Sequence, residues 1–119
     1  MELNLQDKCG KQTITRNDGE IIARVITESW EKEEKIIIDF NNILIASVSF
    51  LDEAFGKLAF EYSKENLIKK LSFINLQEYD RALLNDIIIS RYHQRDLGQN
   101  GPSKLRKGKK TKARISKMN

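Results

Sequence analysis

The run Ile36-Ile37-Ile38-Asp39-Phe40 constrains the fold more than any other feature of this chain. It is continuous and β-branched rather than alternating, which is typical of a strand that is covered on both faces or lies in the middle of a sheet. Such a strand needs neighbouring strands at its edges and helices on its faces. We therefore expect one β-sheet covered by helices.

Three stretches carry apolar residues at helical spacing and predict the main helices: about Asp18–Glu31, Ser49–Tyr62 and Gln77–Arg95. Asn17 is the expected N-cap of the first, with Glu20 closing a capping box. Ser49 is the expected N-cap of the second, which is close to an ideal amphipathic helix.

The remaining apolar runs are short and predict strands. Leu3–Leu5 and Gln12–Thr15 flank the turn-like segment 8–11 and suggest a hairpin. Ile43–Ala46 and Leu71–Ile74 add two more strands, and a short helical turn is expected at 67–68. The predicted fold class is α/β: a single mixed β-sheet of about four to five strands covered by three main helices.

The charge is divided between a body and a tail. Residues 98–119 hold eight of the 21 lysines and arginines and none of the 17 acidic residues, so residues 1–97 are net acidic. The breaker-rich segment 97–103 marks the boundary. We expect a domain over 1–97 and a disordered basic tail over 98–119, because the tail has too few apolar residues to offset its ordering entropy. The basic residues are Lys104, Arg106, Lys107, Lys109, Lys110, Lys112, Arg114 and Lys117.

Two interpretations of this tail are open. Lysines and arginines that neutralise phosphates would release counterions and bind nucleic acid. The alternative is a solubilising tail, or one that contacts an acidic protein surface. No aromatic residue is interleaved with the cations, so the base stacking that holds single strands is missing.

Several classes of function are disfavoured by what the sequence lacks. It has no apolar run long enough to cross a bilayer and no signal-peptide pattern, so we expect a cytoplasmic protein. Cys9 and His93 are the only cysteine and histidine, which is too few for a usual zinc site. We find no phosphate loop and no nucleophile elbow. The chain is therefore expected to be no enzyme and to need no metal or cofactor.

Two segments around Asp39 resemble a known family. They are Ile36 to Ile43, in which a hydrophobic strand ends in Asp-Phe, and Ser47 to Gly56, which begins a helix with Ser-Phe-Leu-Asp-Glu. Both resemble the STAS-like family of small bacterial proteins of uncharacterised function, over roughly residues 2 to 95. The resemblance implies a STAS-like fold. More distantly, the chain is similar to the STAS domains of anti-sigma factor antagonists and sulfate transporters.

In those antagonists the helix start carries a phosphorylated serine, where phosphate can switch a partner off. Here Val48 occupies the phosphoacceptor position, Ser47 replaces an Asp, and Phe50 stands in place of a Gly. Val48 cannot be phosphorylated. Either the switch is lost, or the neighbouring Ser47 or Ser49 has taken it over, or Ser49 only caps its helix.

The resemblance implies a regulatory module that binds a protein, with a histidine-kinase-like ATPase as one partner. The same surface could instead pair two copies of the chain. Asp39 has a second interpretation as a structural cap of the turn at Asn41-Asn42. The expected partner-binding residues are Asp39, Ser47, Val48, Ser49, Phe50, Asp52 and Glu53.

Overall fold

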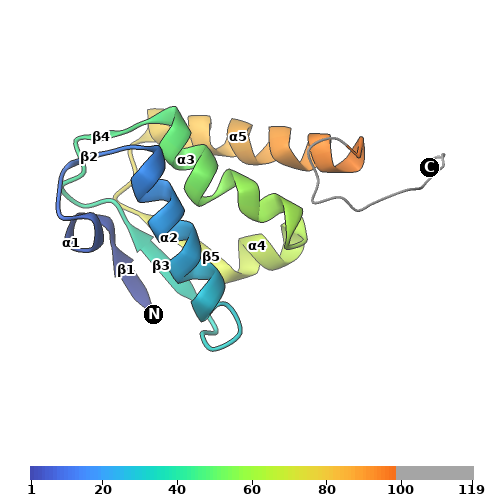
Figure 1. Ribbon diagram of the computed structural model, residues 1–119, viewed down its shortest axis with the longest axis horizontal. Coiled ribbons are helices and arrows are strands. Elements are labelled where there is room, and N and C mark those ends of the chain that lie inside the picture. Colours follow the sequence, from blue (N-terminus) through green and yellow to red (C-terminus); the bar gives the residue numbers. More distant parts are fainter. Residues whose placement is uncertain (99–119) are drawn as a thin grey trace.

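The computed structural model describes residues 1–98, and the basic residues of the expected tail lie outside this range (Figure 1). The elements, in which η1 is a 3-10 helix, are β1 (Glu2–Asn4), α1 (Leu5–Cys9), β2 (Thr13–Ile14), α2 (Arg16–Ser29), β3 (Ile36–Asp39), β4 (Ile45–Ala46), α3 (Val48–Ala54), η1 (Gly56–Phe60), α4 (Lys64–Lys70), β5 (Leu71–Ile74) and α5 (Glu78–Asp96).

The strands form two small parallel sheets instead of one mixed sheet. In the larger sheet β3 lies between β1 and β5, and both pairings are parallel. The isoleucine run therefore forms the central strand, as predicted. β2 and β4 pair in parallel with each other, in a separate sheet. The α/β class is confirmed, whereas the single mixed sheet is wrong.

The expected hairpin between the first two strands is also wrong. α1 separates β1 from β2, and the two strands belong to different sheets. Asn4 caps α1, because its side-chain oxygen accepts the Asp7 N–H at 2.9 Å. Gly10 ends the helix in the left-handed conformation at φ 74°. A glycine in this conformation is typical of a helix C-terminus. Because glycine is equally common in turns, its position is also compatible with the hairpin that the sequence predicts.

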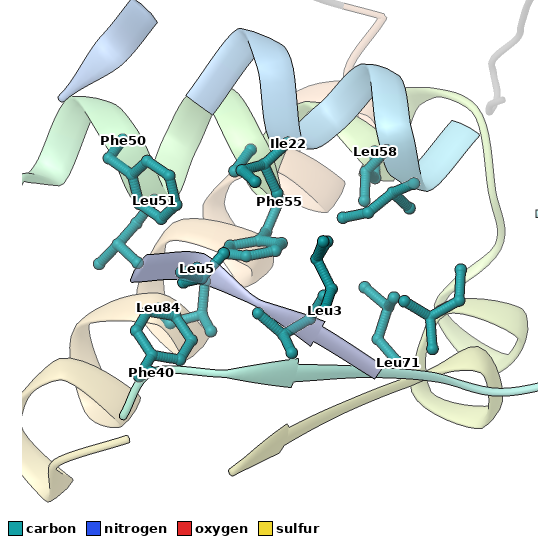
Figure 2. Close-up of a cluster of buried hydrophobic side chains, with 14 of the residues drawn as sticks. Leu3, Leu5, Ile22, Phe40, Phe50, Leu51, Phe55, Leu58, Leu71 and Leu84 are labelled. Carbon is teal, nitrogen blue, oxygen red and sulfur yellow. The ribbon is translucent and has the colours of Figure 1, made fainter. Parts of the chain in front are cut away.

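The core lies between the larger sheet and the helices α2 and α3 (Figure 2). Register places Leu3, Ile38 and Phe73 side by side on adjacent strands. Ile22 from α2 and Phe55 from the end of α3 pack on this face and are fully buried. α2 and α3 run side by side above the sheet (Figure 1).

The first two predicted helices, α2 and α3, begin closer to the N-terminus than their sequence patterns indicate. α2 begins at Arg16, and the buried Asp18 carboxylate accepts the Thr15 backbone N–H at 2.9 Å, so Asn17 is not the cap. α3 begins at Val48, and Ser47 caps it in place of Ser49. In both cases the true cap is the last extended residue before the helix.

The long second helix expected to reach Tyr62 is also interrupted. α3 ends at Ala54, and η1 follows as a separate 3-10 segment. A 3-10 helix keeps apolar residues at three-residue spacing, so the sequence pattern continues across the break. The short turn expected near Ile68 belongs to a longer helix, α4. The last helix and the strand before it are confirmed.

Gly19 lets α2 approach α3 closely. A Cβ at this position would lie 2.9 Å from the Glu53 Cβ and 2.9 Å from the Phe50 backbone oxygen. We expect Gly19→Ala to lower the free energy of unfolding by about 1–3 kcal/mol through overpacking, although alanine is the better helix former. Denaturant unfolding of the variant checks this. The neighbouring, exposed Glu20→Ala is the control, and a more stable Gly19→Ala protein would contradict the close approach.

Candidate functional site

The start of α3 holds two serine hydroxyls next to each other. Ser47 Oγ accepts the Phe50 N–H at 3.0 Å, which is the N-cap bond of the helix. Ser49 Oγ lies 3.0 Å from Ser47 Oγ, so one hydroxyl donates to the other. Both serines are half-buried. Ser47 therefore carries the capping role expected of Ser49, and the Ser49 hydroxyl makes no cap bond.

Exposed apolar residues lie immediately before the serines and between them along the chain. Leu44 is 70% exposed, Ile45 58% and Val48 56%. We call these three residues the Leu44–Val48 patch. Ile45 is in β4 and Val48 is the first residue of α3, whereas Ile14 and Ala46, which pair across the small sheet, turn inward. Val48 thus presents an apolar side chain to solvent.

An open groove of about 650 Å³ runs between α3 and α5. We call it the α3–α5 groove. α3 contributes the serine pair, Val48 and Asp52, while α5 supplies the opposite wall and Arg16 of α2 lies at the rim. Its lining residues are Arg16, Ser47, Val48, Ser49, Asp52, Asp86, Ile87, Ser90, Arg91 and Gln94. Four of the seven expected partner-binding residues therefore line one groove.

Asp52 and Arg91 join the two walls of the groove. Arg91 Nε donates to Asp52 Oδ1 at 2.7 Å, and Arg91 Nη2 donates to Asp52 Oδ2 at 2.5 Å, which makes a bidentate pair. Hydrogen bonding to Arg91 lowers the pKa of the Asp52 carboxyl and raises the pKa of the Arg91 guanidinium. Asp52 is therefore held ionised by its partner. Its role here is to fix α5 against α3.

Phe50 and Glu53 do not line the groove. The Phe50 side chain is fully buried, and its ring centroid lies 5.8 Å from that of Phe55. The expected direct contact between Phe50 and a partner is therefore wrong for this structure, because the core encloses the side chain. Glu53 accepts from Arg16 at 3.2 Å and pairs with Lys57 at 3.1 Å, so it ties the start of α2 to α3.

Asp39 lies at the carboxyl ends of the three parallel strands, outside the α3–α5 groove lining. Its Oδ1 accepts the Asn41 N–H at 2.9 Å and the Asn75 side-chain N–H at 2.8 Å, and its Oδ2 accepts from Asn4 at 3.5 Å. These bonds, that to Asn75 first, lower the pKa of Asp39. The turn-capping interpretation is confirmed by the bond to Asn41.

No local pattern in the sequence selects the polar residues that α5 contributes to the groove. The apolar face predicts the helix, and Asp86, Ser90 and Gln94 lie off that face. Arg91 is 39 positions from Asp52 in the chain. Helical spacing from Asp86 to Ser90 indicates a shared polar face, but not what that face meets.

Other candidate chemistry is sparse in the part of the chain that the structure describes. Cys9 is half-buried, and burial raises the pKa of its thiol, with Asp18 adding to the effect. Over residues 1–98 no three His, Cys, Asp or Glu side chains gather into a group that could hold a metal ion. Over the same residues, no helix is long and apolar enough to cross a membrane. The tail cations from Lys104 to Lys117 lie outside the described range.

Comparison with known proteins identifies a family but no characterised relative. A family model described as a STAS-like domain of unknown function (DUF4325) matches residues 18–81, which is more than half of the chain. The match includes most of α2 and all of β3, α3 and β5, and it therefore includes the serine pair at the start of α3. No curated protein and no solved structure matches.

Removing the charge of Asp52 should loosen α5. We expect Asp52→Asn to lower the free energy of unfolding near neutral pH by about 1.5–3 kcal/mol, the usual value of charge-assisted hydrogen bonds. Because folding depresses this pKa below its ordinary value of 3.8, the contribution is present above that value and lost as pH falls through the folded pKa. The difference between variant and wild type should therefore shrink in acid.

Unfolding curves recorded from neutral to acid pH measure this difference. Asp86→Asn, an exposed change in the lining of the same groove, is the control and should be close to neutral. A difference between Asp52→Asn and wild type that is constant with pH would show that the carboxylate charge is not what matters.

Proposed function

Because the chain belongs to the STAS-like domain family of unknown function, we propose that it is a non-enzymatic regulatory module that binds a protein partner at the start of α3. The single observation that carries this proposal is the exposed Leu44–Val48 patch beside the serine-lined α3–α5 groove. The binding surface we propose comprises the patch together with Ser47, Ser49 and Arg16.

The chemistry of this surface suits a protein interface. Burying one exposed valine, leucine or isoleucine side chain contributes about 1.5–3 kcal/mol, so the patch supplies an apolar centre. Serine hydroxyls and an arginine at its side supply the polar rim that such interfaces carry. Within the described part of the chain, the groove lining includes no histidine that could act as a base toward the serines, which favours binding over catalysis.

The partner class follows from the family resemblance. STAS domains of anti-sigma factor antagonists bind histidine-kinase-like ATPases, and we propose a partner of that class here. Phosphorylation of Ser47 or Ser49 would place a double negative charge at the edge of the patch, near Arg16 and Arg91 of the groove. Of the two, Ser49 is the better candidate, because its hydroxyl makes no cap bond.

A charge at Val48 should abolish partner binding and leave the fold intact. Val48→Asp puts a carboxylate in the centre of the patch, and aspartate is well tolerated in the first turn of a helix. We expect affinity capture from the native host, read by mass spectrometry, to recover a histidine-kinase-like ATPase with wild type and about tenfold less or none with Val48→Asp.

Leu97→Asp is the matched control for this capture. Leu97 is 57% exposed at the end of α5, away from the patch, so this variant should retain the partner. Deleting residues 98–119 should also leave capture unchanged. Equal recovery by Val48→Asp would refute the proposed surface. Sedimentation of the purified protein tests the alternative that the patch pairs two copies, since a dimer that Val48→Asp dissociates would assign the surface to self-association.

A second candidate function, nucleic-acid contact by the tail, is favoured by the eight cations and no acidic residue in 98–119. If all eight reach phosphates on duplex DNA, log affinity should fall against log salt concentration with a slope of about −7. Fluorescence anisotropy with a labelled duplex over a salt series measures this slope. We expect the chain without residues 98–119 to lose the binding, and a shallow slope or retained binding would contradict the electrostatic contact.

A further inference from the structure

A second groove, unrelated to the surface at the start of α3, lies on the other side of α5. It is formed by α4, β5 and α5, and has a volume of about 270 Å³. We call it the α4–α5 groove. Its lining residues are Lys64, Leu67, Ile68, Leu71, Phe73, Asn85, Ile88 and Ile89.

Exposed isoleucines occupy both walls of this groove. Ile68 on α4 is 66% exposed and Ile89 on α5 is 57% exposed, while Leu67 and Leu71 beneath them are 4% and 7% exposed. Single exposed apolar residues are normal on a protein surface. Two of them that border one apolar depression, continuous with the core, indicate a place where further apolar side chains can be buried.

The outer edge of β5, at this groove, is poorly suited to pairing with another strand. β5 is the last strand in the order β1-β3-β5, so no strand among residues 1–98 pairs with its outer edge. Arg81 Nη2 donates to the Phe73 carbonyl oxygen at 3.0 Å and occupies an acceptor of β5. Addition of an extended strand is therefore disfavoured. A helix that lays its apolar side chains between two helices is the better match.

The charged side chains at the groove indicate which kind of partner helix it would bind. Among residues 1–98, Lys64 is the one charged residue in the lining, and Arg81 adds a second cation where it meets Phe73. No acidic residue of this described range lines the groove. We propose that the α4–α5 groove binds an acidic amphipathic helix of a partner protein, with apolar side chains between Ile68 and Ile89 and carboxylates toward Lys64 and Arg81.

Other occupants fit these features less well. The chain's own segment 99–119 is basic and would face Lys64 and Arg81 with like charge. A second copy joined symmetrically through this groove would bring Lys64 toward its own counterpart. Small-molecule pockets usually measure about 300–1,000 Å³, so 270 Å³ suits a few side chains better than a whole metabolite.

Two synthetic helical peptides test the proposal on the full chain. Both carry leucines at i, i+3, i+4 and i+7, and their polar faces are all glutamate in one and all lysine in the other. Isoleucine methyl shifts in NMR titrations report where each peptide binds. We expect the glutamate peptide to shift Ile68 and Ile89, and the lysine peptide to bind at least tenfold more weakly.

Point variants distinguish binding in the groove from electrostatic attraction of the glutamate peptide to the basic residues of 98–119. Every variant keeps those residues, so a difference between variants reports on the groove. Ile68→Ser should weaken the glutamate peptide about tenfold or more, because one exposed isoleucine no longer becomes buried. Lys64→Glu should weaken the glutamate peptide and strengthen the lysine peptide. Leu44→Ser, an equally exposed change in the Leu44–Val48 patch, should have no effect on either peptide.

Three results would overturn the proposal: equal binding of both peptides, shifts that spare Ile68 and Ile89, or Ile68 shifts that depend on protein concentration without peptide. The last would assign the groove to a second copy. The outcome is independent of the proposed regulatory function, because Val48→Asp tests that function at a different surface.

Discussion

The packing of Phe55 holds the architecture together. Its ring lies 5.1 Å from that of Phe73 on β5, 5.8 Å from Phe50 on α3 and 6.3 Å from Phe40 after β3, measured between centroids. One fully buried side chain thus joins the end of α3 to two strands of the larger sheet. Phe50 is enclosed by the same cluster, and its backbone N–H donates to Ser47. The position of the serine pair therefore depends on this core.

α5 is held in a different way. Leu84 is its one buried residue, and polar contacts add to the packing of its partly buried apolar residues Leu83, Ile87, Ile88 and Tyr92 on the core. Arg91 pairs with Asp52, Tyr92 donates to the Tyr62 carbonyl oxygen at 2.8 Å, and Arg95 donates to the Ala59 carbonyl oxygen at 3.0 Å. Polar contacts contribute less net stability per group than full burial of an apolar side chain does. α5 should accordingly respond to pH and to ligands more readily than α2 or α3.

The sequence predicted elements whose signal is local and repeated. The isoleucine run identified the central strand, and the apolar stripe from Leu83 to Tyr92 identified α5, because each pattern reflects packing against the core. The first two strands are present, but the hairpin between them was wrong because Gly10 suits a turn and a helix C-terminus equally well. The sequence did not predict the helix break after Ala54, because the 3-10 segment that follows continues the apolar spacing. The Asp52–Arg91 pair joins distant positions, so no local pattern could reveal it.

The two grooves share α5 as a wall but expose opposite chemistry. The α3–α5 groove places serine hydroxyls and an ion pair beside an apolar patch, whereas the lining of the α4–α5 groove is apolar with a single cation. A ligand that moved α5 would change the lining of both grooves, because α5 supplies residues to each. The ion pair between Arg91 and Asp52 opposes such a shift, since it fixes α5 to the helix that carries the serines. The Asp52–Arg91 pair therefore fixes the wall that the two grooves share, and with it the position of α5 against α3.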